Sequence, residues 1–183
     1  MRRSGPMPRE IGFGADAPSF APPPVFRGAR WFGAIALIAI AAVGAALVSQ
    51  HAFGMEPCPW CILQRLIFVG IAIAALIGVA WRATAGRIVA GLLVLLLALA
   101  GIASAAWQHF YAAPSGSCNL TLADKIINGI GLDSMLPDVF APRATCADAA
   151  VNLFGVPYDF WSLGLFVLLT LAPLRILAAR RPR

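Results

Sequence analysis

The side chains best suited to chemistry in this chain are its cysteines, two of which form a C-x-x-C motif. Cys58 and Cys61 enclose Pro59 and Trp60, and Arg65 follows one helical turn later. A close pair of cysteines can alternate between a dithiol and a disulfide, and each exchange step begins with attack by a thiolate. The motif therefore indicates redox chemistry.

The start of a helix is the place where this motif is expected. Pro59 suits a first helical turn, because the N–H that proline lacks would have no partner there. Cys61 would then lie in the same turn, where unpaired N–H groups and the positive end of the helix dipole favour a thiolate. Arg65, four residues on, would share its face.

The composition places the chain in a membrane. Of its 183 residues, 60% are hydrophobic and only 12% are charged, which is too apolar for an ordinary soluble domain. A membrane-spanning helix needs roughly 20 mostly apolar residues. Such stretches run from about Trp31 to Val48, Ile62 to Ala80, Ile88 to Trp107 and Phe160 to Ala179. We therefore expect an all-α integral membrane protein that forms a four-transmembrane-helix bundle.

The basic residues predict the orientation of this bundle, because Lys and Arg near span ends stay on the cytoplasmic side. They precede the first span, separate the second from the third and follow the fourth: Arg2, Arg3, Arg9, Arg27, Arg30, Arg82, Arg87, Arg180, Arg181 and Arg183. Both termini are therefore expected in the cytoplasm, with every cysteine on the opposite face or at its margin. The net charge of +6 is explained by topology. A basic stripe with interleaved aromatic residues, as nucleic-acid binding would need, is absent from the sequence.

Three regions are predicted along the chain. Residues 1–30 form a disordered, proline-rich cytoplasmic tail. Residues 31–179 form the transmembrane domain, including a periplasmic or otherwise external loop at 108–159, and residues 180–183 form a basic cytoplasmic end. A cleaved signal peptide is the alternative for the first apolar stretch, which is however longer than an h-region of roughly 7–15 residues. Segment 124–136 is expected as a short helix, either on the membrane surface or packed on its own loop.

Two polar residues near span ends are further candidates. An arginine just inside a span costs a few kcal/mol unless it is paired or hydrated, so Arg65 is expected to pair with an anionic species; snorkelling to the interface is the alternative. His109, at the outer end of the third span, can donate a hydrogen bond or pass a proton. Taken alone, it is better explained as a solvated interfacial histidine.

The remaining cysteines, Cys118 and Cys146, form a distant pair in the long external loop. Loop-closure entropy assigns about 3.6 kcal/mol to a disulfide closing a loop of about 29 residues, but only ~2 kcal/mol to one closing about four. A disulfide between Cys118 and Cys146 could therefore be a structural staple, whereas one between Cys58 and Cys61 would make a poor staple.

Together these features resemble the bacterial disulfide bond formation protein B (DsbB) family. The resemblance rests on E-P-C-P-W-C-I-L-Q-R from Glu56 to Arg65 and on Gln108-His109 after the third span. It also includes the two cysteines of the external loop, and L-P-D-V-F followed by A-T-C before the second of them. It covers the chain from about Trp31 to the end of the fourth span. One departure is Gln64, where the family often has Glu, so that position offers Arg65 no ion pair.

The resemblance implies a location in the bacterial inner membrane, active cysteines on the periplasmic side, and an enzyme that reoxidises a thioredoxin-like periplasmic thiol oxidase of the DsbA type. The partner would attack a Cys118–Cys146 disulfide at Cys118, and the released Cys146 would attack Cys58. Cys61 would then pass the electrons to ubiquinone or menaquinone. Arg65 and His109 would contact the quinone carbonyls and stabilise negative charge as it develops.

Three other interpretations remain open at this level. A vitamin K epoxide reductase-like protein also couples cysteines to a quinone, but in that family the C-x-x-C motif lies on a late span and the loop pair precedes it. A zinc protein fits the number of cysteines but not the wide second spacing. A polytopic transporter or scaffold with two structural disulfides would leave Arg65 unexplained.

Overall fold

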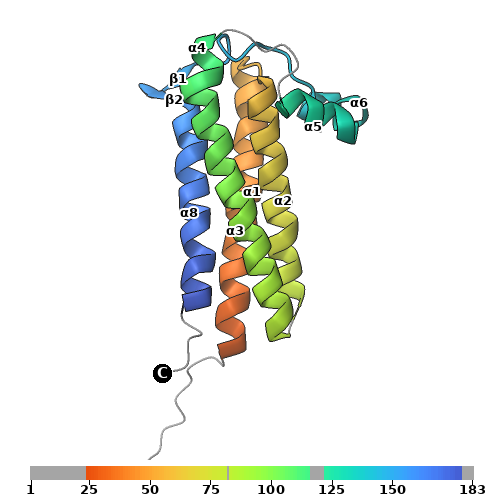
Figure 1. Cartoon of the computed structure of the whole chain (residues 1–183), viewed down its shortest axis with the longest axis vertical. Coiled ribbons are helices and arrows are strands. Elements are labelled where there is room, and N and C mark those ends of the chain that lie inside the picture. Colours follow the sequence, from red (N-terminus) through yellow and green to blue (C-terminus); the bar gives the residue numbers. More distant parts are fainter. Residues whose placement is uncertain (1–23, 82, 116–121, 179–183) are drawn as a thin grey trace, which may run out of the picture.

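The computed structural model describes residues 24–81, 83–115 and 122–178. Within these residues, four long helices run side by side as an up-and-down bundle (Figure 1). They are α1 (Pro24–Phe53), α2 (Pro59–Ala80), α3 (Thr84–Trp107) and α8 (Tyr158–Ala178). The short elements lie together at one end of the bundle, which we call the outer end (Figure 1).

Between α3 and α8 the chain forms a series of short elements. A π-helical turn, η1 (Gln108–Ala112), continues α3 and is followed by α4 (Ala113–Ser115). The segment after that contains α5 (Leu122–Ile130), α6 (Leu132–Met135), α7 (Pro137–Phe140) and the antiparallel strands β1 (Asn152–Leu153) and β2 (Val156–Pro157). The β-hairpin was not expected from the sequence. Its turn contains Phe154 and Gly155, both with positive φ, as a tight hairpin turn requires.

Aromatic side chains and glycines hold the bundle together. The rings of Phe68 on α2 and Phe166 on α8 stack with their centroids 4.1 Å apart. Gly101 on α3 leaves room for Phe166, because a Cβ at Gly101 would lie 2.3 Å from the ring, and Gly78 on α2 does the same for Phe32. Small residues at such contacts let helices approach closely, as is typical of membrane bundles.

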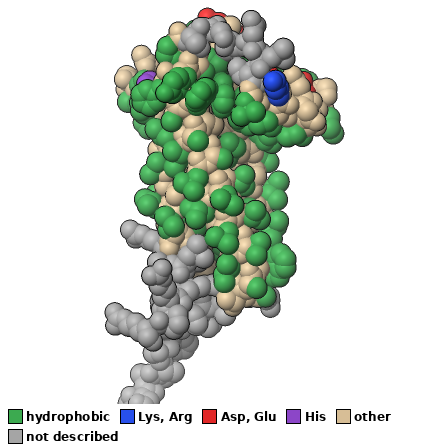
Figure 2. Space-filling view, viewed as in Figure 1, with side chains coloured by type: hydrophobic (Ala, Val, Ile, Leu, Met, Phe, Trp, Pro, Cys, Tyr) green, Lys and Arg blue, Asp and Glu red, His purple; other side chains and the backbone are tan. Residues whose placement is uncertain are grey.

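The outer surface of the bundle is apolar along its length. Leu37 is 69% exposed and Leu96 is 63% exposed, and hydrophobic side chains cover the shaft in the view of Figure 2. In water such a surface would be unfavourable, so it is expected to face lipid. The molecule is compatible with a helical bundle in a membrane.

Three of the predicted spans are confirmed by length and composition, namely the helices at Gly28–Phe53, Pro59–Ala80 and Thr84–Ala112. The fourth corresponds to α8, whose apolar stretch Tyr158–Leu174 is shorter. α1 begins at Pro24 rather than at Trp31, because a proline is tolerated in the first helical turn and no further proline separates it from the apolar stretch. The rest of the expected tail, residues 1–23, lies outside the described residues.

The start of α1 and the end of α8 lie at the same end of the bundle, opposite the outer end (Figure 1). Arg30 and Arg87 belong to the helix ends on that side. Their positions agree with the predicted sidedness, which itself stays a prediction. Arg82 and residues 180–183 fall outside the described part of the chain.

The predicted helix at 124–136 exists, but Gly131, with φ of 71°, divides it into α5 and α6. Ile127 on α5 is buried against Ile62 of α2 and Phe140 of α7. Leu122 and Ile130, at the two ends of α5, are exposed. The helix is therefore packed on α2 by one face, and contact of its other face with a membrane stays a prediction.

The contact between Gly101 and Phe166 gives a test of the packing. Gly101→Ala should lower the free energy of unfolding by about 1–3 kcal/mol, because an overpacked core must shift. Gly44→Ala on α1, where nothing lies within 4 Å of the added Cβ, should leave it unchanged or raise it slightly. Thermal unfolding in detergent measures both. The effect of Gly101→Ala should shrink in a Phe166→Leu background; an equal effect in both backgrounds would contradict the assigned contact.

Candidate functional site

Three cysteines gather at the outer end of α2. Cys58 is the N-cap of the helix, Pro59 is its first residue and Cys61 lies in the first turn, as the sequence predicted. The sulfur atoms of Cys58 and Cys61 lie 2.8 Å apart, and the backbone N–H of Cys61 donates to the Cys58 sulfur over 3.3 Å. The side chain of Cys146, which comes from the external loop, is buried and hydrogen-bonds to Cys58. Cys118 lies outside the described residues.

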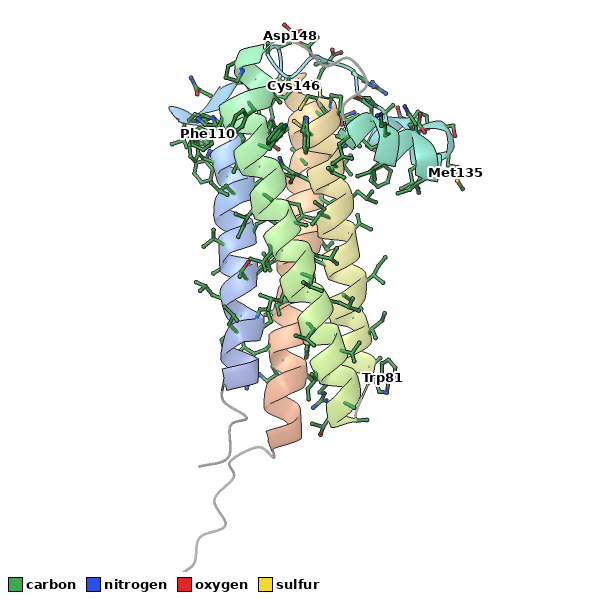
Figure 3. All side chains as sticks on the ribbon, in the orientation of Figure 1. Trp81, Phe110, Met135, Cys146 and Asp148 are labelled. Carbon is green, nitrogen blue, oxygen red and sulfur yellow. The ribbon has the colours of Figure 1, made fainter. Side chains whose placement is uncertain are left out.

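Backbone hydrogen bonds dock the external loop on this helix end. The carbonyl oxygen of Pro57 accepts from the N–H of Arg143 over 2.9 Å and from the N–H of Ala144 over 3.3 Å. That carbonyl is available because α2 begins only at Pro59. A turn follows at once, in which the N–H of Asp148 donates to the Thr145 hydroxyl over 3.2 Å. These contacts bring Cys146 (Figure 3) to the C-x-x-C motif across a long stretch of sequence.

The environment of Cys58 favours the neutral thiol. Its hydrogen bonds to Cys146 and Cys61, together with burial, raise the pKa of the Cys58 thiol above its ordinary value. In the reduced protein, Cys58 is therefore protonated at neutral pH. Since the thiolate is the attacking species in exchange, Cys58 is better suited to be attacked in its disulfide form than to attack as a thiol.

A chain of polar side chains ends at the sulfur of Cys61. Gln108 donates through Nε2 to Cys61 Sγ over 3.3 Å. Gln64 donates through Nε2 to Oε1 of Gln108 over 2.7 Å, and the Ser162 hydroxyl donates to Oε1 of Gln64 over 2.6 Å. Sequence reasoning gave no role to Gln108 or Ser162. A glutamine within a span and another at a span end were the available signals, because buried amides in such places need partners.

Arg65 is 5% exposed and connects three parts of the molecule. Its Nη1 donates to Oε1 of Gln50 on α1 over 3.0 Å and to the carbonyl oxygen of Val139 on α7. Gln50 in turn donates to the carbonyl oxygen of Asp138 over 3.0 Å. Within the described residues, Arg65 forms no hydrogen bond to the anionic partner expected from the sequence, because both of its acceptors are neutral. The Nε of Arg65 is buried and has no hydrogen-bond partner in the described part of the chain.

A cavity of about 770 Å3 adjoins these groups. Cys61, Arg65 and Gln108 are among the residues that line it, and α1, α2 and α8 contribute apolar residues such as Val43, Phe68 and Leu165. Mostly apolar walls with a few placed polar groups are typical of small-molecule sites of roughly 300–1,000 Å3. The cavity therefore has the size and chemistry to hold an apolar molecule with polar substituents.

His109 does not line this cavity. Its Nδ1 lies 2.7 Å from Oδ2 of Asp159, and its ring meets Phe160 at a centroid distance of 4.6 Å. Asp159 is buried and does line the cavity. His109 thus reaches the cavity through Asp159, a residue that sequence reasoning missed. Direct contact between His109 and a bound molecule stays a prediction.

Comparison with known proteins gives a consistent result. The family model "Disulfide bond formation protein DsbB" matches residues 28–176. Disulfide bond formation protein B 1 of Pseudomonas savastanoi pv. phaseolicola is 37% identical over 158 residues, which cover 85% of this chain and 93% of that protein. Disulfide bond formation protein B of Cupriavidus metallidurans is 34% identical over 142 residues, covering 77% and 87%.

The position of Cys146 predicts a disulfide that can be trapped. In a Cys61→Ser, Cys118→Ser variant, only Cys58 and Cys146 remain, and a mild oxidant such as diamide should link them within one chain. Peptide mass spectrometry identifies the linked pair. The same variant unfolded in detergent should link far more slowly. A folded variant that stays reduced, or that forms only intermolecular dimers, would contradict the placement of the loop.

Proposed function

The chain belongs to the family of disulfide bond formation protein DsbB, and we propose that it is a membrane thiol:quinone oxidoreductase. It reoxidises a periplasmic thioredoxin-like thiol oxidase of the DsbA type and passes the electrons to ubiquinone or menaquinone. The observation that carries this proposal is that Cys61 and the buried Arg65 line the same apolar cavity. A structural disulfide would need neither the cavity nor the cation.

The proposed setting is the bacterial inner membrane, with the outer end of the bundle in the periplasm and both termini in the cytoplasm. The distribution of basic residues supports this orientation, because Arg30 and Arg87 belong to the helix ends opposite the cysteines. A periplasmic outer end exposes the loop of Cys146 to a soluble partner. It also lies on the oxidising side, where disulfides persist.

The proposed electron route begins at the external loop. A thiolate of the reduced partner attacks the Cys118–Cys146 disulfide at Cys118, and the electron pair of the broken bond leaves on Cys146. The Cys146 thiolate then attacks Cys58, and the electron pair of the Cys58–Cys61 bond leaves on Cys61. The second step is supported by the hydrogen bond between Cys146 and Cys58. The first step rests on the family resemblance, since Cys118 lies beyond the described residues.

The cavity fits a quinone. Its volume of about 770 Å3 and its apolar walls suit a substituted ring, and Arg65, which lines it, would offer N–H donors to a carbonyl oxygen. When bound, the quinone supplies a two-electron acceptor. Arg65 would orient it and stabilise negative charge, Phe68 and Leu165 would exclude water, and the sulfur of Cys61 would face it from the wall. The pair of Asp159 Oδ2 and His109 Nδ1 would hold a proton at the edge of the cavity.

The proposal predicts thiol-dependent reduction of a quinone. The purified protein, mixed with a reduced thioredoxin-like partner and a short-chain quinone, should lower the quinone absorbance at a rate that depends on both substrates. Cys61→Ser should abolish this activity, because the sulfur at the cavity is lost. Partner and quinone without the protein are the blank. No quinone reduction above the blank by the native protein would refute the proposed function.

Arg65 should matter more for the quinone than for the thiol partner. Arg65→Met keeps the length of the side chain but removes the charge and the donors, and it should raise the KM for quinone about tenfold, the cost of a hydrogen bond to a charged group. The KM for the partner should change less than about twofold. Lys125→Met, at an exposed position of α5, removes a positive charge far from these contacts and should change neither KM. Equal losses for both substrates would instead indicate a folding defect.

A further inference from the structure

A chain of hydrogen bonds ends at the sulfur of Cys61, and its members come from three helical elements. Gln64 comes from α2, Gln108 from the π-helical turn η1 after α3, and Ser162 from α8. Gln64 and Gln108 are each only 4% exposed. Buried amides are costly unless they are bonded, so their connected arrangement has a purpose beyond filling space.

The chain of contacts has a direction. A carboxamide can offer either its oxygen or its nitrogen to a neighbour. The Ser162 hydroxyl occupies the oxygen of Gln64, so the Gln64 nitrogen faces Gln108 and donates to its oxygen. The nitrogen of Gln108 is thereby turned toward Cys61 as a donor. The Ser162 oxygen also lies 2.9 Å from the carbonyl oxygen of Asp159, but the hydroxyl has a single proton, which goes to the shorter contact of 2.6 Å with Gln64.

The π-helical turn places this donor. Such turns insert an extra residue into a helix and are frequent at functional sites. Gln108 is the first residue of η1 and is buried toward Cys61, whereas its neighbour His109 is about one-third exposed and bonds to Asp159. The two adjacent side chains therefore serve different parts of the site.

We propose that Gln108 is a catalytic residue that stabilises the Cys61 thiolate by donating Nε2–H to its sulfur, and that Gln64 and Ser162 are positioning residues that fix the orientation of the amide. This deepens the proposed function, on which it rests for the exchange step. In that step the Cys146–Cys58 bond forms, the Cys58–Cys61 bond breaks, and the negative charge moves from the Cys146 sulfur to the Cys61 sulfur. A donor already aimed at Cys61 stabilises that charge as it develops, as oxyanion-hole donors do.

Neutral amides suit this task better than carboxylates. A carboxylate at Gln64 or Gln108 would place a like charge close to the thiolate and disfavour it. The amides add no charge, so neither position opposes the positive charge of Arg65, which lines the same cavity as Cys61.

The test measures the reactivity of Cys61 without any quinone. In the fully reduced protein at pH 7, the rate of alkylation of Cys61 by iodoacetamide is followed by peptide mass spectrometry. Gln108→Leu should slow this rate about tenfold, because the thiolate loses its donor. Gln108→Glu should slow it at least as much, since it keeps the size but replaces the donor with a charge. Ser104→Ala is the control, because this buried hydroxyl on α3 bonds only to the carbonyl oxygen of Gly101 within the described contacts, and its rate should be unchanged.

Ser162→Ala provides a milder variant in case the substitutions at Gln108 prevent folding. It frees the Gln64 amide to turn and should slow Cys61 alkylation about twofold to threefold. Unchanged alkylation in folded Gln108→Leu, or in Ser162→Ala if the former does not fold, would overturn the proposal. If the native protein reduces no quinone but these variants still slow alkylation, the proposed function fails, whereas the stabilisation of the Cys61 thiolate by Gln108 stands.

Discussion

The carbonyl oxygen of Pro57 is the contact on which the site depends. It accepts hydrogen bonds from Arg143 and Ala144, and so holds the external loop against the first turn of α2. Together with the bonds from Arg65 to Val139 and from Gln50 to Asp138, this contact fixes the loop so that Cys146 lies beside Cys58. The contact is possible because α2 begins at Pro59 and the first carbonyl bonded within the helix is that of Cys58, which leaves the carbonyl of Pro57 outside it.

The site combines one buried cation with neutral partners. Burying an arginine is costly, and Gln50 and the Val139 carbonyl offset part of that cost without cancelling the charge. Arg65 lines the cavity, so its positive charge lies at the cavity wall. The amide of Gln108, which lines the same cavity, donates to the sulfur of Cys61. Negative charge that moves from sulfur to a bound acceptor would therefore develop close to both groups.

The sequence predicted those parts of the site that are determined by residues close together along the chain. The apolar stretches predicted the long helices, and Pro59 predicted that Cys61 would lie in a first turn. The partners of Arg65 and Cys61 could not be predicted, because Gln50, Val139 and Gln108 are distant from them in sequence and meet them only through tertiary packing. The role of His109 was expected from its position alone, whereas its bond to Asp159 depends on how α3 and α8 pack. The β-hairpin before α8 was missed because its strands are too short to show an alternating pattern.

The central claim is that Cys146 delivers electrons to the C-x-x-C motif by direct attack on Cys58. Rapid acid quench during turnover of the native protein, followed by peptide mass spectrometry, measures this most directly. The account predicts a Cys58–Cys146 disulfide that rises and decays at least as fast as the quinone is reduced. A linked species that never forms, or that forms more slowly than turnover, would contradict it.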